Sequence, residues 1–204
     1  MSDAEGLLRD IIDNPHDDTP RRAYADWLDE HGDAARADFI RVQINLEGLG
    51  PDDPRRGGLE ERERSLLCAH RAAWRAALPA LPGVDWGYFR RGFVEEPTFE
   101  NGGAFLAHAA AVFAAAPVRS ADIEGLTPST GPGVARSPHL GRLASLHLFD
   151  SDPGEAVGPR ATTALSALPW HLPLWKHLLR DRPPRSRDNC PSSGRRAFGS
   201  GGYC

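Results

Sequence analysis

The amino-acid sequence predicts a protein that mixes helices and strands, of class α+β tending to α/β. Three observations lead to this fold class. Apolar residues recur at helical spacing between helix caps and breakers in the first 50 residues, residues 59–78 contain neither Pro nor Gly, and an apolar strand pattern recurs after 25 residues. We therefore expect a helical module, a linker with a long helix, a strand-and-helix region and a tail, over residues 1–50, 51–82, 83–169 and 170–204.

Composition and charge bound the class of protein. The 204 residues are 40% hydrophobic, which suits a buried core, and no apolar run approaches the roughly 18–20 residues of a membrane helix. We attribute the 23 Arg against one Lys to a GC-rich gene, because both carry the same charge. Residues 1–50 carry a net charge of −7, which disfavours nucleic acid as the partner. Three cysteines without CxxC spacing and a start without a signal-peptide pattern predict a cytoplasmic chain.

Two short amphipathic helices are expected first. Ser2 has capping-box spacing to Glu5, and the helix that it begins ends at Asn14-Pro15. Thr19 is expected to cap a second helix, with Pro20 at its first position. The apolar face of this second helix consists of Tyr24, Trp27 and Leu28.

A third helix follows, capped by Asp33 and ended by Gly48. Its packed stripe is expected to contain Phe39, Ile40, Ile44 and Leu46. Its solvated stripe is expected to contain Arg36, Asp38, Arg41, Gln43 and Glu47. The three helices together form a small bundle.

The sequence of this helical module resembles a bacterial repeat-companion domain family. The resemblance lies in the YADWL core from Tyr24 to Leu28, the DEHGD turn from Asp29 to Asp33, and the helix from Arg36 to Gln43. It covers about a quarter of the chain. Members of this family open with a short acidic helical module and often continue into leucine-rich repeats, so the resemblance implies an architecture and a neighbour. It implies no reaction.

A cluster of possible metal ligands falls inside this module. It contains Asp26, Asp29, Glu30, His31 and Asp33. The cluster lacks the glycine at loop position six that an EF-hand calcium loop requires, and its carboxylates can pair with neighbouring arginines. We therefore predict a salt-bridged helix face, with no metal and no cofactor, and keep a metal-dependent or catalytic accessory domain as the alternative.

A loop over residues 51–58 is expected to lead into a long helix over Leu59–Leu78, which Pro79 ends. The buried face of this helix is expected to contain Leu59, Leu66, Leu67, Ala73, Trp74, Ala77 and Leu78. Short strands follow at residues 86–89 and 93–94, on either side of a turn at residues 90–92. A helix over Phe105–Ala116 then has an apolar stripe of Phe105, Leu106, Ala109, Val112 and Phe113.

An internal repeat marks the next region. Val118-x-x-Ala121-x-Ile123 recurs 25 residues later as Leu143-x-x-Leu146-x-Leu148. This is the L-x-x-L-x-L spacing of leucine-rich repeats, whose period is usually 20–29 residues. We expect a short, degenerate, leucine-rich-repeat-like fragment of a strand/helix solenoid. An ordinary α/β domain with the same spacing by coincidence is the alternative.

The positions between the repeated apolar residues are expected to lie on the concave surface. They are Arg119, Ser120, Asp122, Ala144, Ser145 and His147, a polar set suited to contacts with another protein. We therefore predict a non-enzymatic protein-interaction module without membrane contact and with an unidentified protein partner. No nucleophile, zinc-protease, P-loop or dinucleotide motif supports an enzyme.

Residues 170–204 form the final region. They contain the one Lys and two of the three Cys, and the repeat spacing is lost there. This composition predicts a disordered tail or the product of an altered reading frame. In the second case the chain is a truncated repeat protein without independent function.

Overall fold

The computed structural model describes residues 3–149, so the predictions for residues 150–204 and for Ser2 lie outside it. The helices are α1 (Asp3–Asp13), α2 (Thr19–Glu30), α3 (Ala34–Gly48), α4 (Arg56–Ala76), α5 (Gly102–Ala115), α6 (Gly131–Ala135) and a 3-10 turn at Pro138–Arg142. The strands are β1 (Val84–Asp85), β2 (Phe89–Arg90), β3 (Phe93–Val94), β4 (Thr98–Phe99), β5 (Ser120–Glu124) and β6 (Ser145–Phe149).

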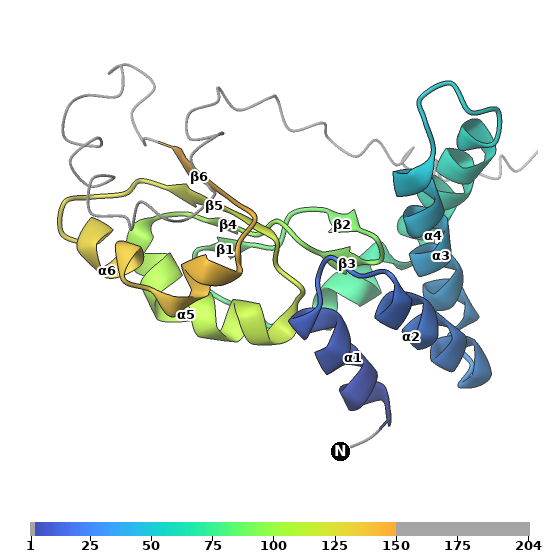
Figure 1. Cartoon of the computed structure of the whole chain (residues 1–204), viewed down its shortest axis with the longest axis horizontal. Helices are drawn as coiled ribbons and strands as arrows, with labels where there is room; N and C mark the ends of the chain where they lie inside the picture. Colours follow the sequence, from blue (N-terminus) through green and yellow to red (C-terminus); the bar gives the residue numbers. More distant parts are fainter. Residues whose placement is uncertain (1–2, 150–204) are drawn as a thin grey trace, which may run out of the picture.

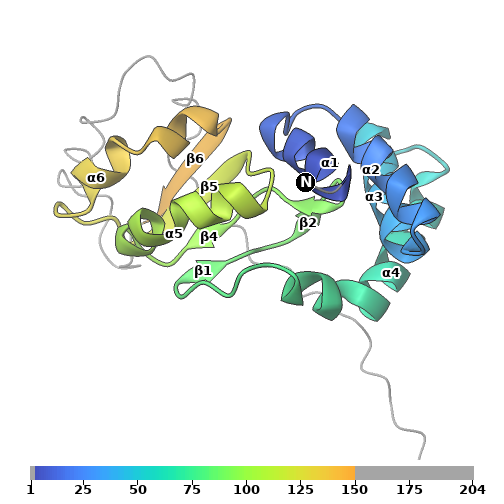
Figure 2. The ribbon, with the colours of Figure 1, turned by 90° about the horizontal axis from the view of Figure 1, so that it is seen from below.

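The strands form one mixed sheet and one hairpin. The sheet has the order β1-β4-β5-β6, with β1 antiparallel to β4 and the other neighbours parallel, while β2 and β3 form the hairpin. Helices α5 and α6 lie against one face of the sheet, α1 lies beside the end of α5, and α2 and α3 lie beyond the hairpin (Figures 1 and 2). The predicted mixture of helices and strands is confirmed.

Helices α1 to α3 form the predicted small bundle, which we call the head. Its core contains Ile11, Ala25, Leu28, Ala37, Ile40, Ile44 and Phe93, the last from the hairpin. Helix α2 begins one residue earlier than predicted, because Thr19 is its first helical residue and not its cap. Asp18 occupies the cap position without a side-chain hydrogen bond, and the Asp17 carboxylate accepts from the Thr19 N–H at 2.8 Å.

Aromatic side chains of α2 and α3 stack within the head and against its neighbours. The Tyr24 and Trp27 rings are parallel with centroids 6.0 Å apart. Phe39 is fully buried, with Trp74 of α4 stacked at 4.6 Å and Phe89 of the hairpin edge-on at 5.7 Å. Phe39 therefore joins the head to both following elements.

Helix α3 is capped by Asp33 as predicted, since its carboxylate accepts from the Arg36 N–H at 3.2 Å. The expectation of a solvated Gln43 is wrong, because α4 and the hairpin cover that side of the helix. Gln43 Nε2 donates to Glu63 at 2.6 Å and to the Phe89 carbonyl at 3.0 Å. Gln43 Oε1 accepts from the Gly92 N–H at 2.7 Å. The Gln43 amide of α3 thus bonds to both α4 and the hairpin.

Helix α4 differs from its prediction at its start and in its buried face. It begins at Arg56 and includes Gly57 and Gly58, which the sequence placed in the loop. Only Leu66 of the predicted face is buried, while Ala73 and Ala77 are exposed. The physical reason is that α4 packs beside α3 along a narrow stripe at the edge of the molecule (Figure 2).

The hairpin turn and α5 lie close to their predicted positions. Arg91 and Gly92 form the turn with φ angles of +48° and +86°. Asn101 caps α5, and Phe105 and Phe113 of its stripe are buried. Leu106 is an exception, with 46% of its surface exposed, because it lies outside the core cluster, beside Gly133 of α6.

The 25-residue repeat corresponds to the pairing of the parallel strands β5 and β6. Ser120 pairs with Ser145, and each following residue of β5 pairs with the residue 25 positions later in β6. Strand β4 adds a third member that the sequence analysis missed, since Phe99 pairs with Ile123 at a separation of 24 residues. The structure therefore stacks the segment at residues 94–99 beside the two predicted repeats.

The repeated apolar positions form the core beneath the sheet. Those that are buried are Val94, Phe99, Val118, Ala121, Ile123, Leu143 and Leu146, and Leu148 is partly buried against them. They pack on the inward stripe of α5. Because side chains alternate along a strand, the polar residues between them lie on the opposite face of the sheet.

Candidate functional site

The outward positions of β5 and β6 form two side-by-side pairs. The Ser145 hydroxyl donates to the Ser120 hydroxyl at 2.7 Å. Nδ1 of His147 lies 2.9 Å from the Asp122 carboxylate. Both pairs follow from the register of the strands, because Ser120 faces Ser145 and Asp122 faces His147. The residues predicted for the binding face are thus brought together on one surface.

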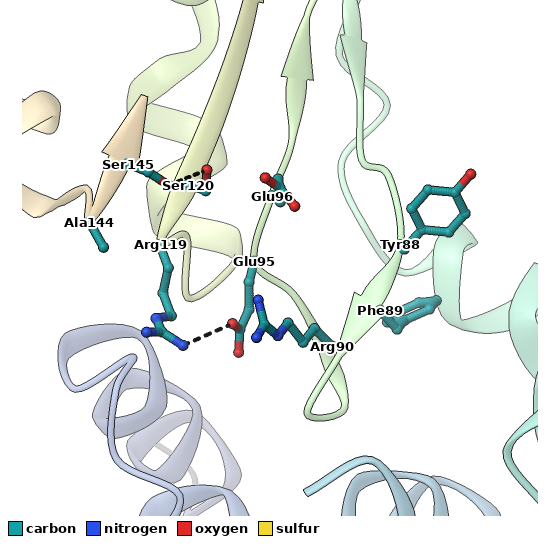
Figure 3. A pocket seen from close by; sticks show the side chains of 9 residues that line it. All are labelled: Tyr88, Phe89, Arg90, Glu95, Glu96, Arg119, Ser120, Ala144 and Ser145. Carbon is teal, nitrogen blue, oxygen red and sulfur yellow. Dashed lines mark hydrogen bonds and ion pairs between the residues drawn. The ribbon is translucent and has the colours of Figure 1, made fainter. Parts of the chain in front are cut away.

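A pocket of about 300 Å³ opens at the end of this face, beside the hairpin (Figure 3). It is lined by Tyr88, Phe89, Arg90, Glu95, Glu96, Arg119, Ser120, Ala144 and Ser145. Four of the six predicted concave-face positions, Arg119, Ser120, Ala144 and Ser145, therefore line it. Asp122 and His147 lie farther along their strands and are not part of the lining.

Glu95 forms the inner wall of the pocket and is almost fully buried, with 3% exposed. One of its oxygens accepts from Arg21 Nη2 at 2.9 Å and from Arg91 Nε at 2.9 Å. Its other oxygen lies 3.7 Å from Arg119 Nη1. Three arginines thus surround one carboxylate, and Asp18 supplies a second negative charge through Arg91.

Burial shifts the protonation equilibria of this cluster. It raises the pKa of Glu95, against the charges of Arg91, Arg21 and Arg119, which lower it. Burial and the neighbouring Arg91 lower the pKa of Arg21 to about 10, while Glu95 opposes that shift. His16 faces the same arginines, and its pKa is lowered first by burial and then by the charge of Arg119.

Some hydrogen-bonding capacity at the pocket is unused within residues 3–149. Arg119 Nε and the second oxygen of Glu95 are buried and have no hydrogen-bond partner there. Such atoms carry a desolvation cost of about 1–3 kcal/mol each unless a partner is supplied. Because both atoms are closed off from solvent, the polar groups that an entering molecule can meet in the pocket include the hydroxyls of Ser120 and Ser145.

The hydroxyls of the pocket lack the surroundings of a catalytic nucleophile. Ser120 and Ser145 bond to each other, and within residues 3–149 neither bonds to a histidine or a carboxylate. An activated serine needs an adjacent base. The arrangement is suited to binding rather than to nucleophilic catalysis.

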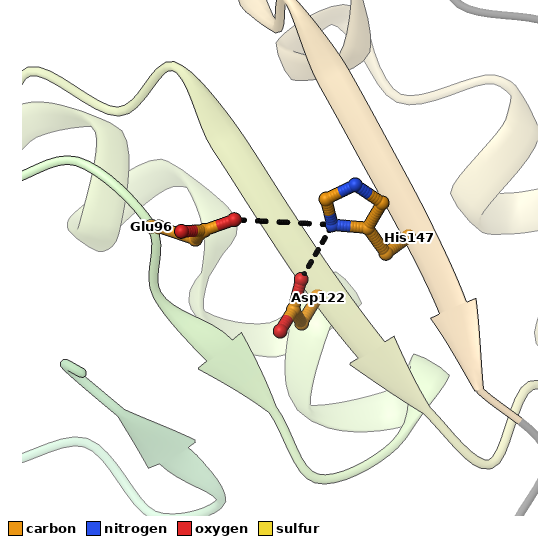
Figure 4. Close-up of side chains that lie close together, drawn as sticks. All are labelled: Glu96, Asp122 and His147. Carbon is orange, nitrogen blue, oxygen red and sulfur yellow. Dashed lines mark hydrogen bonds and ion pairs between the residues drawn. The ribbon is translucent and has the colours of Figure 1, made fainter. Parts of the chain in front are cut away.

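A second polar group lies beside the pocket, on the same face (Figure 4). The carboxylates of Glu96 and Asp122 both point toward His147, whose Nδ1 lies 3.9 Å from Glu96 and 2.9 Å from Asp122. Glu95 and Glu96 were not among the predicted site residues, because no strand was expected at the position of β4. The buried apolar positions Val94 and Phe99, which share the spacing of the repeat, are the signal that could have found them.

The acidic cluster of the head is used differently. Asp26 and Asp29 both accept from Arg41, at 2.7 and 2.8 Å. The His31 ring stacks on Trp27 with centroids 4.0 Å apart, and Asp33 caps α3. Glu30 is exposed. These five side chains do not converge on a common point, since the group of metal-type side chains found within residues 3–149 is Glu96, Asp122 and His147.

Comparison with known proteins gives no relative from which a role could be transferred. The chain matches no known protein family, no curated protein and no solved structure. Within the part of the chain that the structure describes, no helix has both the length and the apolar character needed to span a bilayer.

Proposed function

We propose that this protein is a non-enzymatic protein-interaction module and that its binding surface is the outward face of β5 and β6. Arg119, Ser120, Asp122, Ser145 and His147 are the contact residues of that surface. The observation that carries the proposal is their alignment: two strands 25 residues apart place equivalent polar side chains side by side. The repeated core beneath holds these side chains on a rigid support.

The chemistry of the face favours a polypeptide as the partner. Arg90 and Arg119, each paired with a glutamate, lie on the same face as the carboxylates of Glu96 and Asp122, so the surface is mixed in charge. A polar surface of mixed charge with a small pocket suits the side chains and backbone amides of a protein. A nucleic acid would require an excess of cations on the surface. The hydroxyls of Ser120 and Ser145, which line the pocket, can donate to or accept from the amide groups of a peptide bond.

The resemblance to the repeat-companion family is part of the same proposal. The helical head would be the companion module, and the strands spaced by 24 and 25 residues would be the first units of a degenerate leucine-rich-repeat array. A cytoplasmic location accords with this proposal. The metal-dependent or catalytic alternative at Asp26–Asp33 has weaker support, because Arg41 engages two of the carboxylates.

Site-specific photo-crosslinking tests the surface without a known partner. Ala144 is exposed at the pocket, and Ala73 is exposed on α4, so a photoreactive amino acid at either position replaces the same residue type. We expect the full chain to crosslink to a protein of its host from position 144 and not from position 73.

The crosslinked protein is then purified and its affinity for the chain is measured directly. Replacing Arg119, Asp122 and His147 together by Ala, Asn and Gln should weaken binding at least about tenfold, while replacing the exposed pair Glu61 and Arg64 by Gln should leave it unchanged. An unchanged affinity of the triple variant, with its fold intact by circular dichroism, would rule out this surface.

A further inference from the structure

Three side chains from neighbouring segments of the sheet converge at one point of its outward face. Glu96 precedes β4, Asp122 lies in the middle of β5, and His147 lies opposite it in β6. One ligand atom from each side chain lies within 4.8 Å of the other two. Figure 4 shows both carboxylates directed at the same nitrogen of the imidazole ring.

The spacing of these atoms is close to that of a metal site. In a tetrahedral zinc site with bonds of about 2.0–2.2 Å, the ligand atoms lie about 3.3–3.6 Å from one another. Nδ1 of His147 lies 2.9 Å from Asp122 and 3.9 Å from Glu96, one slightly below this range and one slightly above it. Small side-chain rotations would bring both to the required distance, and the strands hold the backbone in place.

The two carboxylates of Glu96 and Asp122 favour a bound divalent cation over a single proton on His147. A proton on Nδ1 of His147 can bond to the Asp122 carboxylate at 2.9 Å but does not reach Glu96 at 3.9 Å, whose side chain is 54% exposed to water. Within residues 3–149, no arginine or lysine forms an ion pair with Glu96 or Asp122. A divalent ion in place of the proton would neutralise both carboxylates at once, and a neutral imidazole with carboxylates is a donor set that zinc accepts.

This group differs from the acidic cluster of the head in the property that matters for a metal. Asp26 and Asp29 are already neutralised by the Arg41 guanidinium, which bonds to both. At the sheet the ligands are partly exposed, with 54% of the Glu96 side chain and 25% of the His147 side chain accessible. Solvent can therefore reach the ion and complete its coordination.

We propose that Glu96, Asp122 and His147 bind a divalent transition-metal ion of the zinc type, through two carboxylate oxygens and Nδ1 of the imidazole. The remaining coordination position or positions are taken by water, as in an open site. The proposal does not depend on the protein-interaction function, because it rests on the donor atoms alone.

Calorimetric titration of the full chain with Zn²⁺ tests the site. We expect saturable binding of one ion that is at least about tenfold weaker in His147→Gln and in Asp122→Asn, because each removes a ligand. His31→Gln is the matched control, since His31 lies in the head and stacks on Trp27. Its binding should equal that of the unchanged chain.

Nuclear magnetic resonance of the histidine rings decides the question without relying on a substitution that could disturb folding. Addition of Zn²⁺ to the unchanged chain should shift Nδ1 of His147 in a long-range ¹H–¹⁵N spectrum, and His31 should stay in place. Absence of saturable binding overturns the proposal. So does Zn²⁺ binding that leaves the His147 resonances unmoved or that survives both ligand substitutions.

Discussion

Arg21 of α2 and Glu95, 74 residues later in the chain, form an ion pair of 2.9 Å in which neither side chain has more than 3% of its surface exposed. The pair connects the head to the wall of the pocket. Arg91 adds its own bonds to Glu95 and also bonds to the Pro15 carbonyl and to Asp18. The orientation of the head against the sheet is therefore set by buried charges as well as by apolar packing.

Glu95→Gln should lower the free energy of unfolding by about 3–5 kcal/mol, because it leaves buried arginines without their counter-charge. Chemical denaturation of the full chain measures this change. Glu61→Gln is the control, since the Glu61–Arg64 pair is exposed, and an exposed pair contributes about 0–1 kcal/mol. Equal losses in the two variants would mean that the buried cluster does not stabilise the fold.

Gly92→Ala should destabilise the protein by at least about 2 kcal/mol, because the residue has a φ angle of +86° and adjoins α3. A Cβ atom there would lie 3.0 Å from the Cβ and 3.1 Å from the Cα of Ile40. Gly58→Ala in α4 meets no atom within 4 Å and should leave stability unchanged or raise it by up to about 1 kcal/mol. Thermal unfolding compares the two variants. A Gly92→Ala protein as stable as the original would contradict the close approach of hairpin and helix.

Phe99→Ala should cost about 3–5 kcal/mol, because Phe99 is fully buried and its ring contacts Phe105 edge-on at 5.0 Å. Leu106→Ala should cost less, because Leu106 is 46% exposed and only part of its side chain lies against Gly133 of α6. Urea unfolding of both variants checks the orientation of α5. A reversed order of the two losses would place the wrong face of the helix against the sheet.

Arg119→Gln should raise the pKa of His16 toward its ordinary value of 6.5, because the charge of Arg119 lowers that pKa. The control is Arg142→Gln, which should raise the pKa of His139 and leave that of His16 unchanged. Titration of the ring protons by nuclear magnetic resonance measures both values. If the pKa of His16 were the same in the Arg119→Gln variant as in the unchanged chain, the charge of Arg119 at the pocket would not act on His16.

The lowered pKa of His16 also makes the stability of the protein depend on pH. Because the pKa of His16 is lower in the folded chain than in the unfolded chain, protonation favours unfolding. The contribution of His16 is therefore fully present above pH 6.5 and is lost as the pH falls through the folded-state pKa. Arg119→Gln should make the stability less dependent on pH in this interval.

Local signals predicted much of the fold. Asp33 caps α3 and the 25-residue spacing sets the register of β5 and β6, because capping and strand alternation depend on residues close in sequence or on a regular period. Gln43 was placed in solvent because its burial depends on Glu63 and on the hairpin, 20 and 46–49 residues away. No local pattern encodes such a contact.

The candidate site was predicted in part for the same reason. The outward residues of β5 and β6 follow from the repeat, and four of the predicted positions line the pocket. Glu95 and Glu96 were missed because β4 pairs over only two residues, and the inward positions at and just before it are Phe99 and Pro97 rather than leucines. The arginines that surround Glu95 come from three separate elements, so their meeting could be found only in three dimensions.

Because Arg21 and Glu95 lie 74 residues apart, the helices of the head are synthesised before the residues that they pack against. The head needs Phe93 for its core and Glu95 for its buried arginine, so its three helices emerge from the ribosome before their packing partners exist. At roughly 5–20 residues per second, the interval between residue 48 and residue 95 lasts on the order of 2–9 seconds. During that interval the nascent helices expose their apolar faces, which makes them candidates for chaperone capture until the hairpin closes the bundle.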